Sequence, residues 1–210
     1  YSDNFKNIFD LYINNSTCAP GLLGSKAVTD SMAEFALGQC AMVQNGNWAW
    51  GQVADVDGNT VKEEDIKFMP IYTGVSGEES QGLCTGTENF WCVNKQASEA
   101  DQKATLDFVN WMISSEAGKN YMLNSLGNAA PFSTFGDSEK PSDPLEKEMY
   151  RFMENGKNSV TWNFTTFPSQ AFKDDFGAAL LEYCNGNMSW DDVKNLVVTR
   201  WAEEKSATAQ

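Results

Sequence analysis

The sequence predicts an α/β fold that is dominated by helices. Helical hydrophobic periodicity recurs along the 210 residues, and only a few short apolar runs of strand length lie between the helical segments. Hydrophobic residues make up 41% of the chain and aromatic residues 12%, which is enough for a core and argues against a disordered chain. No run reaches the ~20 apolar residues of a membrane-spanning helix. The length suits one large domain or two small ones.

Charge and composition exclude several classes of function. The 15 basic and 29 acidic residues give a net charge of −14, which argues against a nucleic-acid partner because phosphate binding requires clustered Lys and Arg. The chain contains no His, so Ser-His and Cys-His nucleophilic mechanisms and His metal sites are excluded. No glycine-rich phosphate-binding motif occurs. We expect no cofactor and no bound metal.

The first third of the chain is predicted to alternate helices with a short strand. Residues 2–14 form a helix, because apolar side chains recur there on one face. A capping box at Ser31-Met32-Ala33-Glu34 predicts a second helix that begins near residue 31 and ends at Gly38. The apolar run at residues 40–44 predicts a strand, which is followed by an Asn45-Gly46 turn.

The remaining chain is predicted to add short extended segments and serine-capped helices. Extended segments are expected at residues 66–72, 83–93 and 160–168. Serine residues are placed to cap helices because their hydroxyl accepts a hydrogen bond from a free amide of the first turn. These helices are expected from Ser98 to about Ile113, from Ser114 or Ser115 to Gly127, over residues 144–155, from Ser169 to about Tyr183, and from Ser189 onwards.

The five cysteines are odd in number and form no C-x-x-C pair, which argues against zinc ribbons and thioredoxin-like redox sites. Cys84 and Cys92 lie too far apart to form a disulfide if the residues between them form a straight strand. We therefore expect small buried thiols, while one disulfide elsewhere stays open.

Aromatic residues in turns and loops are the strongest indication of a binding site. Trp48 and Trp50 follow the Asn45-Gly46 turn, and Trp162, Phe164 and Phe167 lie in a loop-like stretch. A sugar ring stacks an apolar C–H face on an indole, and its hydroxyls require polar groups around the rim. The polar candidates are Asn45, Asn47, Glu88, Asn89, Asn163 and Lys173. The alternative, in which these aromatic side chains are core residues, stays open.

Paired carboxylates raise the second possibility of a carbohydrate-active enzyme. A glycosidase needs two carboxyl groups ~5–9.5 Å apart across a cleft, a separation that sequence does not show. The adjacent pairs are Glu63-Glu64, Asp174-Asp175 and Asp191-Asp192. Their positions in a polar loop and on helices favour a solvated face. A third possibility is a structural fragment in which all aromatic side chains are interior.

Three stretches of the chain resemble a known family. They are Phe35-x-x-Gly38-x-x-Ala41-Met42-x-x-Asn45-Gly46-x-Trp48-Ala49-Trp50, Thr87-Glu88-Asn89-Phe90-Trp91-Cys92-Val93-Asn94-Lys95, and Gly186-x-x-Ser189-Trp190-Asp191-Asp192-Val193. In order and spacing they resemble the extracellular solute-binding proteins of carbohydrate ABC transporters, which form family 1, the maltose-binding protein class. The resemblance spans about residues 2–203.

The resemblance implies a periplasmic-binding-protein-like (type II) two-lobed clamshell, of which this chain is mainly the C-terminal lobe. Residues 1–86 and 141–210 would belong to that lobe. Residues 87–140 would supply a hinge-crossing strand and helices to the N-terminal lobe, whose other part is missing. Such a protein is not an enzyme: it binds an oligosaccharide and delivers it to the permease subunits of an ABC transporter.

The resemblance also implies which residues contact the sugar. Trp48 matches a position that stacks on a sugar ring, with Asn47 and Trp50 beside it. Residues just before the crossing strand and before the following helix line the cleft in relatives. These candidates are Thr87, Glu88, Asn89, Asn163, Phe164 and Phe167. The maltose-binding relative has an aromatic pair near Lys173-Asp174 that this chain lacks, which argues against a maltodextrin.

The expected location is extracytoplasmic, at the bacterial cell surface or in the periplasm. Tyr1 and the residues after it do not form a leader, so we expect a processed or truncated product whose missing N-terminal segment would hold a lipoprotein anchor. That segment is also an expected partner, because without it apolar surface would be exposed.

Overall fold

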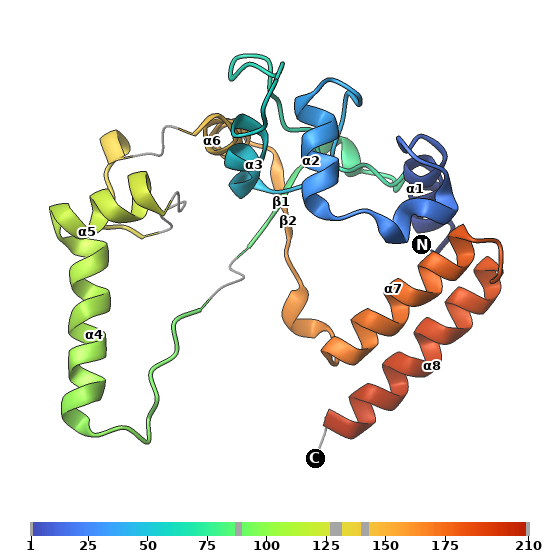
Figure 1. Ribbon diagram of the computed structural model, residues 1–210. Helices are drawn as coiled ribbons and strands as arrows, with labels where there is room; N and C mark the ends of the chain where they lie inside the picture. Colours follow the sequence, from blue (N-terminus) through green and yellow to red (C-terminus); the bar gives the residue numbers. More distant parts are fainter. Residues whose placement is uncertain (1, 87–89, 127–131, 140–142, 209–210) are drawn as a thin grey trace. The chain divides into compact units, whose positions relative to one another are not determined.

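The computed structural model describes residues 2–86, 90–126, 132–139 and 143–208 (Figure 1). The chain divides into two compact units. The first unit contains residues 1–31, 70–86 and 158–210, and the second contains residues 32–69 and 87–157. Each unit is therefore assembled from segments that lie far apart in the sequence.

The first unit is built around a pair of long helices at the C-terminal end of the chain. Helices α7 (Gln170–Cys184) and α8 (Trp190–Thr208) lie side by side (Figure 1). The other elements of this unit are α1 (Ser2–Asn14) and the 3-10 turns η1 (Pro20–Ser25), η3 (Glu78–Ser80) and η6 (Phe164–Thr166). Ala179, Trp190 and Val193 form the buried core between them.

Aromatic rings connect the elements of the first unit. Phe5 of α1 contacts Phe176 of α7 at 6.0 Å and Trp190 of α8 at 5.9 Å between ring centroids. Tyr183 meets Trp190 edge to face at 5.3 Å, and its hydroxyl donates to Asp10 Oδ1 at 2.8 Å. Such ring pairs stabilise a core beyond the area that they bury, by ~0.5–1.5 kcal/mol each.

A short parallel sheet of two strands completes the first unit. Strand β1 (Gln81–Thr85) pairs with β2 (Asn158–Thr161), with Cys84 opposite Val160 and Thr85 opposite Thr161. Parallel strands require a long crossover connection, which is here the chain between residues 85 and 158.

The second unit has a mainly aliphatic core. Its elements are α2 (Val28–Ala36, which begins in the first unit), η2 (Asn47–Ala49), α3 (Trp50–Ala54), α4 (Glu99–Ser114), α5 (Glu116–Asn120), the π-turn η4 (Tyr121–Ser125), η5 (Asp137–Glu139) and α6 (Pro144–Glu154). The buried residues of its core are Met32, Ala36, Ala49, Val53, Ile66 and Leu145.

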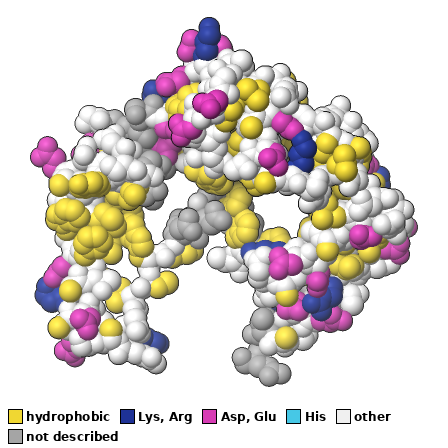
Figure 2. Space-filling view, in the orientation of Figure 1, with side chains coloured by type: hydrophobic (Ala, Val, Ile, Leu, Met, Phe, Trp, Pro, Cys, Tyr) yellow, Lys and Arg dark blue, Asp and Glu magenta, His cyan; other side chains and the backbone are white. Residues whose placement is uncertain are grey.

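Helix α4 contacts α5 and η4 but is largely exposed within its unit. None of its residues is buried, although it carries Leu106, Phe108 and Trp111. Hydrophobic side chains gather over α4 and α5 in the space-filling view (Figure 2). An apolar helix face of this kind is typical of an interaction surface.

The helix predictions are confirmed with one shift in a start, and the helix after Ser115 continues beyond Asn120 as the π-turn η4. Its predicted end at Gly127 lies outside the described residues. The helices after Ser98, Ser115, Ser169 and Ser189 form, and each serine hydroxyl accepts a first-turn amide. The predicted capping box at Ser31 is wrong, because α2 already begins at Val28. Asp30 explains the earlier start, since its carboxylate accepts the Ala27 amide at 2.8 Å. Gly38 follows the helix with φ +71°, the left-handed conformation that favours glycine at a helix end.

Two of the predicted strands do not form. Residues 40–44 and 66–72 have no ladder partner among the described residues. Val43, Ile66 and Phe68 of these segments pack into the core of the second unit instead. The Phe68 amide donates to the Glu148 carboxylate at 3.4 Å. The extended segments at 83–93 and 160–168 are shorter than predicted, because the strands end at Thr85 and Thr161.

The expectation of buried thiols is also wrong. Cys84 and Cys92 are exposed, the other three cysteines are half-buried, and all five are free thiols. The helices and loops that carry them leave one side open, so these small side chains are not enclosed. Among the described residues, no helix combines the length and the apolar character needed to cross a membrane.

Candidate functional site

The predicted site residues fall into two groups, one in each unit. Asn47, Trp48 and Trp50 lie together on η2 and the start of α3 in the second unit. Asn163, Phe164 and Phe167 lie together in the first unit, on the connection between β2 and α7. Thr87, Glu88 and Asn89 lie outside the described residues.

The first group is a turn that presents an indole to solvent. Trp48 is 58% exposed, whereas Ala49 beside it is buried in the core of the second unit. Trp50 is half-buried and packs against that same core. The two tryptophans therefore differ: Trp48 offers its ring to a ligand, and Trp50 anchors the turn.

Close packing on the turn orients Trp48. A Cβ added at Gly46 would lie 2.3 Å from Cη2 and Cζ3 of Trp48, so the indole lies directly against the glycine backbone. The Asn45 side chain supports the turn, since its Oδ1 accepts the Gly46 amide at 2.8 Å. One face of the indole is thus occupied by the turn, and the exposed remainder is available for stacking.

A buried carboxylate holds the neighbouring amide in place. Glu146, in the first turn of α6, is 1% exposed, and its Oε1 accepts from Asn47 Nδ2 at 3.3 Å. The α6 helix itself is fixed at its start by Asp143, whose Oδ1 accepts the amides of Leu145 and Glu146. Glu146 of α6 therefore fixes the orientation of the Asn47 side chain in the absence of a ligand.

The same helix carries a second buried carboxylate, Glu148. The Arg151 guanidinium donates to both of its oxygens, at 3.1 and 2.7 Å, and holds the pKa of Glu148 below its usual value. The Phe68 amide and the Lys67 ammonium lower the pKa further, while burial opposes them. This cluster ties α6 to residues 67–68 within the second unit.

The second group is a row of aromatic rings, which we call the aromatic platform: Trp162, Phe164 and Phe167. Trp162 stacks on Phe164 at 4.9 Å between centroids with an interplanar angle of 20°, and Phe164 lies 6.1 Å from Phe167. Phe164 and Phe167 are 41% and 38% exposed, so both rings are partly open to solvent. The exposed Asn163 lies between Trp162 and Phe164 in sequence and adds a polar group.

The platform is built on the strand pair. The Trp162 amide donates to the Thr85 carbonyl at 3.0 Å, which extends the β1–β2 ladder by one bond. A Cβ at Gly86 would lie 2.6 Å from Trp162 Cβ, so only glycine permits this approach. The Trp162 Nε1 group is buried and has no hydrogen-bond partner among the described residues.

Behind the platform, the rings continue into the α7–α8 pair. Phe167 contacts Phe172 at 5.8 Å and Trp201 at 5.7 Å, and Phe172 is 2% exposed. Lys173 Nζ lies 4.3 Å from the Phe164 centroid and 5.6 Å from that of Phe167. Lys205 Nζ lies 5.8 Å from the Trp201 centroid. The platform therefore has an aromatic base, with Lys173 over its own rings and Lys205 over Trp201 of the base.

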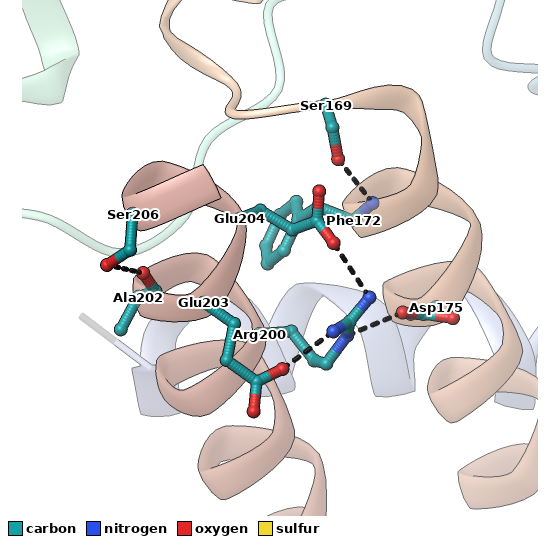
Figure 3. A network of polar contacts seen from close by, with 8 residues as sticks. All are labelled: Ser169, Phe172, Asp175, Arg200, Ala202, Glu203, Glu204 and Ser206. Carbon is teal, nitrogen blue, oxygen red and sulfur yellow. Dashed lines mark hydrogen bonds and ion pairs between the residues drawn. The ribbon is translucent and has the colours of Figure 1, made fainter. Parts of the chain in front are cut away.

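A charge network fastens the two helices together (Figure 3). Arg200 donates to Glu203 at 2.6 Å, to Asp175 at 2.7 Å and to Glu204 at 2.9 Å. These carboxylates, Glu203 first, raise the pKa of Arg200. Asp175 belongs to α7 and the other partners to α8, so the network joins the helices that support the platform.

The adjacent carboxylates take part in helix and surface contacts. Asp174 accepts from Gln170 at 2.8 Å and Asp175 from Arg200. Asp191 pairs with Lys194, and Asp192 accepts from the Ser189 hydroxyl at 2.6 Å. In the described part of the chain, no three His, Cys, Asp or Glu side chains gather as a metal site would require.

Two shallow grooves lie away from these groups. One of about 380 Å³ in the first unit borders β1 and β2, and one of about 390 Å³ in the second unit borders α6. Neither groove is lined by a residue predicted to contact the sugar, although Glu63 and Glu64, one of the paired carboxylates, line the groove at α6. The exposed aromatic groups are therefore better candidates than either groove for the recognition of a ring-shaped ligand.

Sequence reasoning did not assign Trp201, Lys205 or Glu146 to the site. In the sequence, Trp201 is part of the apolar face of a helix. Its contact with Phe167 depends on tertiary packing, which the sequence does not show. Lys205 follows Trp201 by four residues, a helical spacing that places both side chains on one face and gives a usable signal. Glu146 carries no such signal, because surface glutamates in a first helical turn are common.

Comparison with known proteins gives one match. The family model described as bacterial extracellular solute-binding protein matches residues 6–148. Neither the curated proteins nor the solved structures contain a significant match. The matched residues include the Trp48 turn and helix α4, whereas the aromatic platform lies beyond them.

Proposed function

Because the chain belongs to the bacterial extracellular solute-binding protein family, whose members bind solutes for ABC transport, we propose that its solute is an oligosaccharide. The protein would deliver this ligand to the permease subunits of a carbohydrate ABC transporter. No covalent chemistry on the ligand is needed, since affinity comes from ring stacking and hydrogen bonds, and the closure of two lobes would signal that the ligand is bound.

The observation that carries the proposal is the exposed aromatic platform. Phe164 and Phe167 are partly open to solvent in a row of stacked rings, and the polar Asn163 is exposed next to Phe164. A sugar presents an apolar C–H face and a polar rim, which matches this combination of rings and amides. Trp48, with Asn47 held behind it by Glu146, offers the same combination in the second unit.

We also propose the two-lobed organisation that the resemblance implies. Residues 1–86 and 141–210 would form the C-terminal lobe, and residues 87–140 would cross to the N-terminal lobe. The end of β1 at Thr85 supports only the start of the proposed crossing. The two compact units divide the chain differently, since residues 32–69 and 141–157 fall with residues 87–140. Thr87, Glu88 and Asn89 would then lie at the hinge and contact the ligand.

A further segment of the same polypeptide is the proposed cover for α4. Leu106 and Phe108 are more than half exposed, and Tyr121 of the adjoining turn is also open to solvent. A segment N-terminal to this chain would pack on these residues and carry a lipid anchor at the outer face of the membrane. Hydrogen exchange of α4 in a polypeptide extended at the N-terminus tests this: strong protection relative to the 210 residues alone supports it. A compact monomer of the 210 residues that unfolds cooperatively would contradict it.

A tryptophan-fluorescence titration of the full-length protein with a panel of oligosaccharides tests the function. We expect a saturable change with at least one of them, and at least tenfold weaker binding in Trp48→Ala and Phe164→Ala. Trp111→Ala is the matched control, since this exposed indole lies on α4 outside the proposed site. No response to any sugar, or equal losses in Trp48→Ala and in the control, would refute the proposal.

A further inference from the structure

We infer that the ligand of the aromatic platform is an anionic saccharide, and that Lys173 recognises its charged group. The inference rests on the proposed carbohydrate function and narrows it to one substrate class. A sugar ring bearing a carboxylate or a sulfate ester has both features that the platform would address, an apolar face and a negative charge.

The position of Lys173 is the first argument. Lys173 lies in the first turn of α7, and its ammonium rests 4.3 Å from the Phe164 centroid. Its long side chain is half-buried against the platform instead of extending into solvent. The ammonium lies over the Phe164 ring, so the cation–π contact holds the charge at the surface of the platform and lowers the entropy cost of using it for a ligand.

The second argument concerns the acidic groups on the same helices. Asp174 accepts from Gln170, and Asp175, Glu203 and Glu204 all bind Arg200 (Figure 3). Among the residues that the structure describes, Lys173 has ring contacts but no ion pair. Arg200 thus draws the nearby carboxylates together on α7 and α8, and the charge of Lys173 stays available to a ligand.

The third argument is the positive charge at the platform in a chain that is acidic as a whole. The protein has a net charge of −14, yet two positive charges, those of Lys173 and Lys205, lie over the rings of the platform and its base. A neutral sugar requires hydrogen-bonding groups but no such charge. An anionic group would form a charge-assisted hydrogen bond with Lys173, which is about twice as strong as a neutral one.

Matched saccharide pairs test the inference by calorimetric titration of the full-length protein. The pairs are an oligogalacturonate and its methyl ester, a glucuronate-containing oligosaccharide and its carboxyl-reduced form, and a sulfated disaccharide and its desulfated form. We expect a charged member to bind at least tenfold more tightly than its neutral counterpart, with a preference that weakens as salt is added. The carboxylate and sulfate pairs show which anionic group is recognised.

Variants connect that preference to Lys173. Lys173→Gln should remove the preference for the charged member over the neutral member. Lys194→Gln, which removes a lysine paired with Asp191 elsewhere on α8, should change neither affinity. Equal binding of both members, binding of neutral sugars alone, or an unchanged preference in Lys173→Gln would overturn the inference and leave the carbohydrate function standing. Binding of no saccharide at all would overturn both.

Discussion

Helices α7 and α4 have almost the same local design and very different surroundings. They contain 15 and 16 residues, and each begins after a serine whose hydroxyl accepts a first-turn amide, at 3.0 Å for Ser169 and 3.2 Å for Ser98. Helix α7 packs against α8 and buries Phe172 and Ala179, whereas α4 buries no residue within its unit. Local signals therefore place both helices, and only neighbouring elements decide how firmly each one is held.

The largest expected difference between the two helices is in the stability lost when one phenylalanine of each is replaced by alanine. Phe172→Ala should lower the free energy of unfolding by about 3–5 kcal/mol, because it leaves a cavity among packed rings. Phe108→Ala on α4 should change it by about 0.5 kcal/mol or less, since that ring is 58% exposed. Urea denaturation of both variants measures this, and equal losses would mean that α4 is packed after all.

Acid should weaken α6, which shares the second unit with α4 but is tied to its surroundings by charge. The pKa of Glu148 is lowered in the folded protein, so the unfolded state takes up the proton first on acidification. The stabilisation is complete above the ordinary glutamate value of 4.5 and is lost as the pH falls through the lower folded pKa. Glu148→Gln should reduce stability at pH 7 and flatten its decline below pH 4.5, as measured by urea midpoints. A decline as steep as in the unchanged protein would contradict this.

Removal of the serine caps should have a smaller effect, and an unequal one. Ser169→Ala should cost about 1 kcal/mol of global stability, because α7 unfolds together with its neighbours. Ser98→Ala removes a similar hydrogen bond, but α4 can open alone, so amide exchange in its first turn should accelerate roughly fivefold without a change in the urea midpoint. A lowered midpoint in Ser98→Ala would show that α4 is coupled to the rest of its unit.

The smallest expected effect on stability is that of a substitution at Gly46, where the Trp48 ring limits the space for a side chain and the backbone conformation does not. Gly46→Ala should alter stability by only about 0.5 kcal/mol, since φ −110° suits alanine. The new methyl group would displace the Trp48 indole, so quenching of its fluorescence by iodide should change. Gly51→Ala is the control, because no atom lies within 4 Å of its added Cβ. An identical quenching response in both variants would show that Gly46 does not orient the ring.

The difference between local signals and tertiary packing also explains how much of the fold could be predicted from the sequence. Serine caps are local chemistry, so the starts of α4, α5, α7 and α8 could be predicted within a residue. Strands depend on a partner that no local pattern shows. Residues 66–72 have the composition of a strand, yet Ile66 and Phe68 enter a helical core and the Phe68 amide pairs with Glu148.

The candidate site could be predicted only in part, for a related reason. Exposed rings that follow turn signals, such as Trp48 and Phe164, are visible in the sequence as aromatic residues outside periodic segments. Contacts made by tertiary packing are not, which is why the contact of Trp201 with Phe167 and the support of Asn47 by Glu146 emerge only from the structure.

The parallel pairing of β1 with β2 has a consequence for how the protein is made and exported. Gln81 pairs with Asn158, so the ladder cannot form until the whole intervening chain has been synthesised. The first unit also needs residues 158–210, which contain both α7 and α8, before these helices can pack. Contacts between such distant residues form slowly. We therefore expect the emerging polypeptide to remain unfolded long enough to pass through a secretion channel. The first unit should fold only after the chain has crossed the membrane.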